Sequence, residues 1–61
     1  MKTATFDKGL KTLHFFDSKD TAINVVCSTI AKAKTFLEKC GVEHYKIDVY
    51  NKCVYLKTEW L

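Results

Sequence analysis

Residues 17–41 carry the most regular hydrophobic pattern in the chain, and any fold has to accommodate it. Apolar side chains recur there at steps of three and four residues, which places them on one face of an α-helix. Asp17 or Ser18 suits the N-terminal cap, and Gly41 suits the left-handed residue that commonly follows a helix. The pattern predicts a helix over about residues 18–40, with one apolar face made of Ile23, Val26, Cys27, Ile30, Ala33, Leu37 and Cys40.

Two β-rich runs precede this stretch, at about residues 2–6 and 10–16. The residues between them end in Gly9, which suits a hairpin loop that needs a positive φ. In the second run Leu13 and Phe15 share one face of a strand, and Phe16 points to the other face. We therefore expect a hairpin with an aromatic ring on the side away from the helix.

Two further runs, at about residues 43–50 and 53–60, alternate between apolar and polar side chains. Such alternation is typical of strands with one buried face. Asn51-Lys52 suits a two-residue turn, because Asn tolerates the left-handed conformation. The register that this turn imposes pairs Tyr50 with Cys53, Val49 with Val54, Ile47 with Leu56 and Tyr45 with Thr58.

Together these patterns predict a single α+β domain over residues 1–61, in the order β-β-α-β-β. One amphipathic helix would pack on one face of a small, mostly antiparallel sheet. The chain is short enough that one core is expected. That core would contain Leu13, Phe15, Ile23, Val26, Ile30, Leu37, Ile47, Val49, Val54, Leu56 and Trp60.

The basic residues are ten lysines without an arginine, and the formal net charge is +3. Arginine is the usual residue for bidentate contacts to guanine and phosphate, so its absence weakens the case for sequence-specific nucleic-acid binding. The chain has an odd number of cysteines, Cys27, Cys40 and Cys53, and their spacing does not match a metal site. This pattern indicates free thiols in the cytoplasm. We expect no signal peptide and no membrane-spanning segment.

The predicted register leaves one face of the last hairpin uncovered by the helix. Tyrosine gives a large contact area with few rotatable bonds and is enriched at interfaces. Exposed aromatic residues are also common in strands without any binding role, so the sequence leaves that simpler interpretation open. The candidate partner-binding residues are Tyr50, Tyr55, Lys46, Lys57, His44 and Phe16.

The sequence shows no arrangement typical of catalysis. The cysteines and histidines are not spaced as nucleophile and base or as metal ligands, and the two glycines stand alone rather than in a phosphate loop. We therefore expect no enzyme activity, no metal site and no cofactor.

The element order, the single amphipathic helix at 17–41 and the Trp-ended hairpin at 44–60 resemble small phage-encoded inhibitors of host machinery, such as anti-CRISPR proteins. That resemblance implies a module that binds a host nuclease, polymerase or toxin and blocks its surface without chemistry. It transfers no functional residue to this chain.

Two alternatives remain open. The first is nucleic-acid binding, with the tyrosines stacking on bases and the lysines meeting phosphates. The second is a homodimer formed through the uncovered face. In a homodimer the polar stripe of the helix would be the surface left for binding, and it consists of Asn24, Ser28, Lys32, Thr35 and Lys39.

Overall fold

The computed structural model describes residues 2–61, so residue 1 of the expected domain lies outside the described residues. The chain forms a small α+β domain, as expected, with one helix and one mixed sheet in the described residues. The elements are β1 (Lys2–Asp7), β2 (Thr12–Phe16), β3 (Ala22–Val26), α1 (Ile30–Lys39), β4 (Tyr45–Asn51) and β5 (Val54–Trp60).

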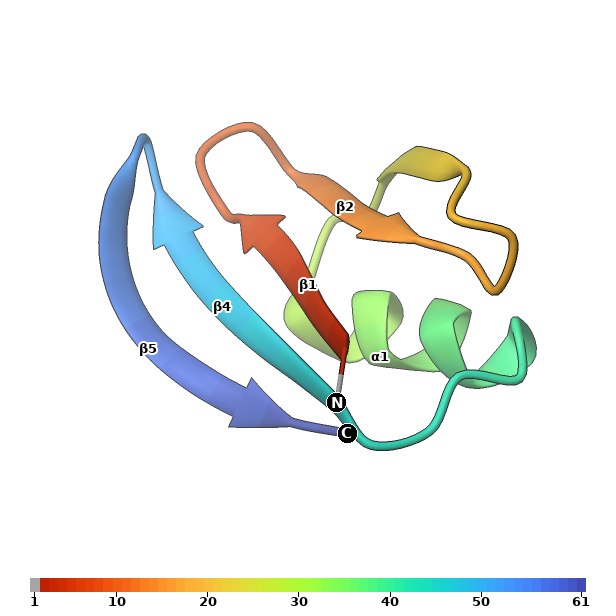
Figure 1. Ribbon diagram of the computed structural model, residues 1–61. Helices are drawn as coiled ribbons and strands as arrows, with labels where there is room; N and C mark the ends of the chain where they lie inside the picture. The colour runs from red at the N-terminus through yellow and green to blue at the C-terminus, as the bar shows by residue number, and fades with distance from the viewer. Residues whose placement is uncertain (1) are drawn as a thin grey trace.

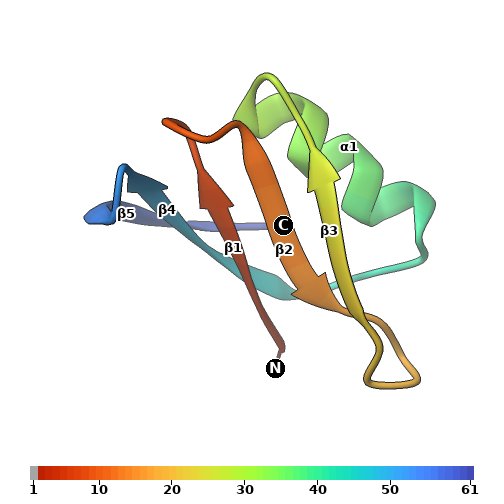
Figure 2. The same cartoon turned by 90° about the horizontal axis from the view of Figure 1, so that it is seen from above.

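The sheet has five strands in the order β3-β2-β1-β4-β5. β1 pairs with β4 in parallel, and the other three neighbouring pairs are antiparallel, which confirms a mostly antiparallel sheet. The chain crosses from β3 at one edge to β4 in the interior by way of α1, which lies on one side of the sheet (Figures 1 and 2).

The predicted extent of the helix, residues 18–40, is wrong in its first half. Residues 22–26 form β3 instead, so the observed order is β-β-β-α-β-β rather than β-β-α-β-β. Asp17 does bind backbone amides, but those of Lys19 and Thr21 in the turn between β2 and β3 rather than those of a helix. The helix begins later, where the Thr29 side chain accepts a hydrogen bond from the Lys32 amide at 3.2 Å.

The predicted end of the helix is confirmed. α1 ends at Lys39, and Gly41 has a φ of +74°. The Gly41 amide donates to the Glu38 carbonyl and the Val42 amide to the Leu37 carbonyl, each at 3.0 Å. These two bonds satisfy carbonyl groups of the last turn, and glycine adopts the required left-handed conformation without strain.

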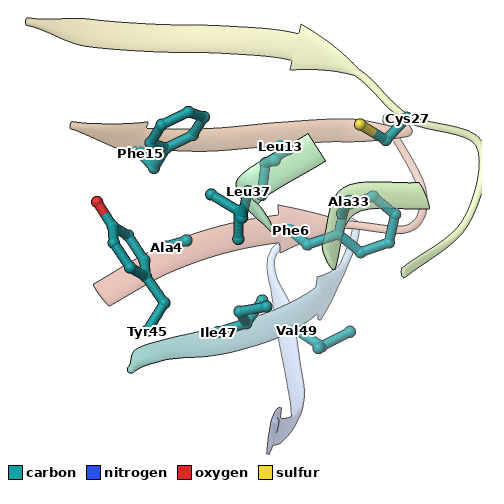
Figure 3. Close-up of a cluster of buried hydrophobic side chains, with 10 residues drawn as sticks. All are labelled: Ala4, Phe6, Leu13, Phe15, Cys27, Ala33, Leu37, Tyr45, Ile47 and Val49. Carbon is teal, nitrogen blue, oxygen red and sulfur yellow. The ribbon is translucent and has the colours of Figure 1, made fainter. Parts of the chain in front are cut away.

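The core lies between α1 and the inner three strands (Figure 3). Five expected core residues are fully buried, namely Leu13, Phe15, Leu37, Ile47 and Val49, while Ile23 and Ile30 are partly buried. The expected core omitted five residues that are buried, although two of them, Cys27 and Ala33, were predicted on the apolar face of the helix. The five are Ala4, Phe6, Cys27, Ala33 and Tyr45. The expected core was wrong for Val26, Val54, Leu56 and Trp60, which are exposed.

The turn of the last hairpin lies one residue later than predicted. Lys52 and Cys53 have φ values of +50° and +70°, the left-handed values of a type I′ turn, and Asn51 pairs with Val54. The predicted pairing of Tyr50 with Cys53 is therefore wrong.

A bulge in β5 changes the register further along the hairpin. Tyr50 pairs with Tyr55, but the next residue of β4, Val49, pairs with Lys57. Leu56 is therefore an extra residue in β5, and beyond it each side chain of β5 points to the face opposite to the predicted one. Val49–Lys57, Ile47–Glu59 and Lys46–Trp60 replace the pairs predicted by a regular ladder.

The first prediction compares two residues that a longer helix would bury equally. Leu37→Ala should lower the free energy of unfolding by about 2–5 kcal/mol, because Leu37 is fully buried and the truncation leaves a cavity. Val26→Ala should change it by less than about 0.5 kcal/mol, because Val26 is 79% exposed on the edge strand. Urea denaturation followed by circular dichroism measures both values, and a loss at Val26 as large as that at Leu37 would contradict the assignment of residues 22–26 to a strand.

Candidate functional site

The side of the sheet away from α1 is the candidate site, and we call it the open face. Side chains of a strand alternate between the two faces, so the buried residues Phe6, Leu13 and Ile47 identify the helix side and their neighbours identify the open face. The observed pairing places these residues on the open face: Ala22, Asn24, Val26, Thr12, His14, Phe16, Thr3, Thr5, Asp7, Lys46, Asp48, Tyr50, Tyr55, Thr58 and Trp60.

A polar row crosses the middle of the open face. Asn24, His14, Thr5, Asp48 and Thr58 are successive partners across all five strands. His14 Nδ1 lies 2.5 Å from Asn24 Oδ1, and the Thr58 hydroxyl donates to Asp48 Oδ1 at 2.9 Å. These two hydrogen bonds fix the side chains at both ends of the row.

Aromatic side chains lie on both sides of the polar row. Tyr50 and Tyr55 pack edge to face with ring centroids 5.6 Å apart, and Tyr55 also hydrogen-bonds to Thr58. Phe16 packs edge to face on His14 at 5.4 Å. Trp60 is 57% exposed, Tyr55 51% and Phe16 48%, so large apolar area remains in contact with solvent.

Four of the six predicted site residues lie on the open face. Phe16, Lys46, Tyr50 and Tyr55 do so, and the two tyrosines are direct partners across the hairpin. Lys46 pairs with Trp60 and lies 3.8 Å from the Asp48 carboxylate.

The other two predicted site residues, Lys57 and His44, lie elsewhere. Lys57 follows the bulge and so faces the helix side, where it pairs with Glu59 at 2.5 Å. His44 precedes β4 in a bend, with a φ of +58°, and is exposed outside the sheet. The prediction assumed regular alternation through both positions, and local backbone irregularity ends that alternation at each.

Trp60 is the site residue that sequence reasoning missed. A regular hairpin places it on the buried face, whereas the bulge at Leu56 reverses the last part of β5 and exposes it. Neither glycine nor proline marks the bulge, so the sequence carries no signal for this reversal.

Glu59 lies between two lysines on the helix side of the sheet. Its carboxylate is 2.8 Å from Lys34 Nζ of α1 and 2.5 Å from Lys57 Nζ. Hydrogen bonds from Lys34 and then from Lys57 lower the pKa of Glu59 to about 2. This ion pair ties α1 to the edge strand β5 and leaves Lys57 unavailable to the open face.

The charged groups of the open face are two carboxylates and one ammonium, from Asp7, Asp48 and Lys46. Asp7 Oδ1 accepts hydrogen bonds from the amides of Leu10 at 2.9 Å and Lys52 at 3.3 Å. The bond from Leu10 contributes most to a lowered pKa of Asp7, which keeps this carboxylate ionised. The open face is therefore slightly acidic, although the whole chain is basic.

The described residues contain no cluster of three or more histidine, cysteine, aspartate or glutamate side chains suited to a metal ion. Cys27 is buried, and burial raises the pKa of its thiol, which disfavours the reactive thiolate. Cys40 and Cys53 are exposed free thiols. None of the helices in residues 2–61 is long and apolar enough to cross a membrane.

Searches against protein-family models, curated proteins and solved structures found no match to this chain.

The second prediction concerns the Glu59 ion pair. Because the pKa of Glu59 falls from 4.5 to about 2 on folding, its stabilisation is full above pH 4.5 and is lost as the pH falls toward 2. Glu59→Gln should therefore lower the free energy of unfolding by about 1 kcal/mol at neutral pH and flatten its decline below about pH 4.5. Urea denaturation as a function of pH measures this, with Glu43→Gln in an exposed loop as the control. An acid profile of Glu59→Gln that matches the wild-type profile would contradict the ion pair.

Proposed function

We propose that this chain is a small non-enzymatic protein-binding module that acts by occupying a partner's surface with its open face. The observation that carries the proposal is the combination of exposed aromatic rings with a nearly uncharged, ordered sheet surface. Aromatic side chains dominate the energetic centres of protein interfaces, and charged residues are depleted there.

Phe16, Tyr55 and Trp60 supply the contact area for such an interface. They come from two strands of one sheet, Phe16 from β2 and the other two from β5, so their backbone positions are fixed by the hydrogen-bonded ladder. Tyr50 supports Tyr55, since it is partly buried and packs edge to face against that ring. Binding to a surface ordered in this way costs little additional conformational entropy.

The charge of the open face favours a protein over a nucleic acid. Single-stranded nucleic acids bind where aromatic rings are accompanied by a positively charged groove. Here Lys46 is the lone ammonium among the described residues of the face, and it lies beside Asp48. Two carboxylates against one ammonium would repel a phosphate backbone, so we place nucleic-acid binding second.

The mode of action that we propose is steric blocking, of the kind that phage-encoded inhibitors exert on nucleases, polymerases or toxins. The face offers anchors and hydrogen-bonding groups without a nucleophile beside a base. His14 is engaged by Asn24, and Cys53 lies in the β4–β5 turn. We place the module in the cytoplasm, because all three cysteines are free thiols.

The third prediction tests the open face directly. A photo-crosslinking amino acid at Tyr55 should capture a protein from bacterial lysate in a ratio near one to one, whereas the same amino acid at Leu10 should not. Leu10 is a matched control, because it is 69% exposed but lies in the β1–β2 turn. Two variants should weaken capture by about tenfold or more when the photo-crosslinking amino acid is placed at an open-face position other than 50, 55 and 60. They are Tyr50→Ala with Tyr55→Ala, and separately Trp60→Ala. The reason is that aromatic anchors buried in an interface contribute about 2 kcal/mol or more.

Circular dichroism and thermal unfolding show whether each variant is folded. Trp60→Ala removes an exposed side chain and should leave the fold intact, so it keeps the test valid if the tyrosine variant unfolds. Equal capture from Tyr55 and Leu10, or full capture by folded Trp60→Ala, would remove the open face from the proposal. A crosslink to a second copy of the chain would identify a homodimer interface instead.

The fourth prediction addresses the nucleic-acid alternative. Fluorescence anisotropy with single-stranded RNA and DNA oligonucleotides should show no binding at physiological salt, and Tyr50→Ala with Tyr55→Ala should change nothing. Binding that depends steeply on salt and is lost in the tyrosine variant would place nucleic acid first.

A further inference from the structure

The outer edge of β3 has backbone groups available for an additional strand. β3 is an edge strand, and the Cys27 amide donates to the Lys11 carbonyl of the neighbouring β-hairpin at 2.8 Å. Hydrogen-bonded pairs alternate in an antiparallel ladder, so the odd-numbered residues of β3 bond to β2. Ala22, Asn24 and Val26 consequently direct their N–H and C=O groups outward, where another strand can pair with them.

A groove runs between this edge and α1. Its volume is about 470 Å³, and Val25, Cys27 and Phe36 give it an apolar floor. Phe36 is held in place by edge-to-face packing on Phe15, with ring centroids 6.1 Å apart. The groove lies on the helix side of the sheet and meets the open face at Val26, which also borders it.

The helix side of the groove is basic. Lys32, Thr35 and Lys39 line it from successive turns of α1. Lys34, on another side of the helix, pairs with Glu59, but within residues 2–61 neither Lys32 nor Lys39 has a carboxylate partner in an ion pair. Two uncompensated ammonium groups thus border an apolar groove beside an unpaired strand edge.

We propose that the β3 edge and this groove bind an extended acidic segment of a partner protein, which adds to the sheet as a further strand. Its backbone pairs with Ala22, Asn24 and Val26, as in other complexes formed by strand addition. On the helix side, an apolar side chain of the segment lies over Val25 and Phe36. Carboxylates on either side of that residue meet Lys32 and Lys39.

The spacing of the charges agrees with this arrangement. Lys39 comes seven positions after Lys32 in α1, which corresponds to a rise of about 10.5 Å along the helix axis. Residues i and i+4 of a strand lie on the same face about 13 Å apart. Flexible lysine side chains can accommodate that difference, so a segment of the form Glu-x-Val-x-Glu fits both lysines at once.

A second copy of this chain is a poor occupant of the same edge. Antiparallel pairing of two β3 strands would place both α1 helices on one side of a continuous sheet. Lys32 and Lys39 of each copy would then face their counterparts, and like charges at close range are destabilising. Charge complementarity therefore favours an acidic segment.

The fifth prediction uses defined peptides. A blocked, fluorescein-labelled peptide with a Ser-Glu-Ser-Val-Ser-Glu-Ser core should bind at low salt, as measured by anisotropy. The same peptide with lysine in place of glutamate should bind roughly tenfold more weakly or not at all. Lys32→Glu with Lys39→Glu should reverse that preference. Lys8→Glu with Lys52→Glu makes the same change in net charge in the β1–β2 and β4–β5 turns, away from the β3 edge, and should leave the preference unchanged.

Two further measurements test the strand geometry. The amides of Ala22, Asn24 and Val26 should become protected from hydrogen exchange when the acidic peptide binds. Val26→Pro, which removes an outward amide without removing a bond to β2, should weaken binding. The proposal is overturned by equal binding of the two peptides, by unchanged preference in the Lys32/Lys39 variant, by absence of edge protection, or by a dimer that the peptide does not dissociate. The open-face variants Tyr50→Ala and Tyr55→Ala should leave peptide binding intact, so the two proposals can fail separately.

Discussion

The helix α1 covers the hydrophobic core on one side of the sheet. Its size limits how much of the sheet surface is buried in the described residues. Ten residues of helix are about 15 Å long, whereas five strands at about 4.8 Å spacing make a sheet about 19 Å wide. Ala33 allows α1 to approach closely, and Leu37 fills the space above the central strands. One helix of this size leaves the edges of the sheet incompletely covered and the opposite face open. The two candidate binding surfaces are both consequences of this limit.

The predicted helix is too long because residues 22–30 fit both the periodicity of a helix and the alternation of a strand. Ile23, Cys27 and Ile30 fit a helical spacing, but Ile23, Val25 and Cys27 also alternate as in a strand, and the structure follows the second pattern. The local chemistry favours that outcome, since β-branched residues dominate the segment and are stiff in a helix. Thr29 also marks a helix start before Ile30, because its side chain is a good N-terminal cap. Hydrophobic periodicity alone could not choose between the two, whereas side-chain branching and capping together indicate the strand.

Two local irregularities limit prediction at the open face: the bend at His44 and one extra residue in β5. Alternation places Tyr50, Tyr55, Lys46 and Phe16 correctly, because no irregularity separates them from the strand centres used to assign the faces. No glycine or proline near Leu56 indicates an extra residue in β5, so the sequence predicts a regular ladder of pairs between β4 and β5. One such residue moves Trp60 out of the core. It also moves Lys57 and Glu59 to the helix side, where the ion pair with Lys34 compensates for placing charge near the core.

The two surfaces differ in charge but meet at β3. Asn24 and Val26 present their side chains on the open face, and their backbone groups form the edge beside the groove. A strand added there would widen both sides of the sheet. Its helix-side residues would lie over the basic groove, and its alternate residues would continue the open face next to Asn24 and Phe16. A partner whose acidic strand pairs with β3 would thus already be positioned against the aromatic surface. Tethering of this kind raises the effective concentration of the second contact without requiring either contact to be strong. Under the two proposals, a short chain with a modest core would hold a partner through two individually weak surfaces, and the edge strand would couple them.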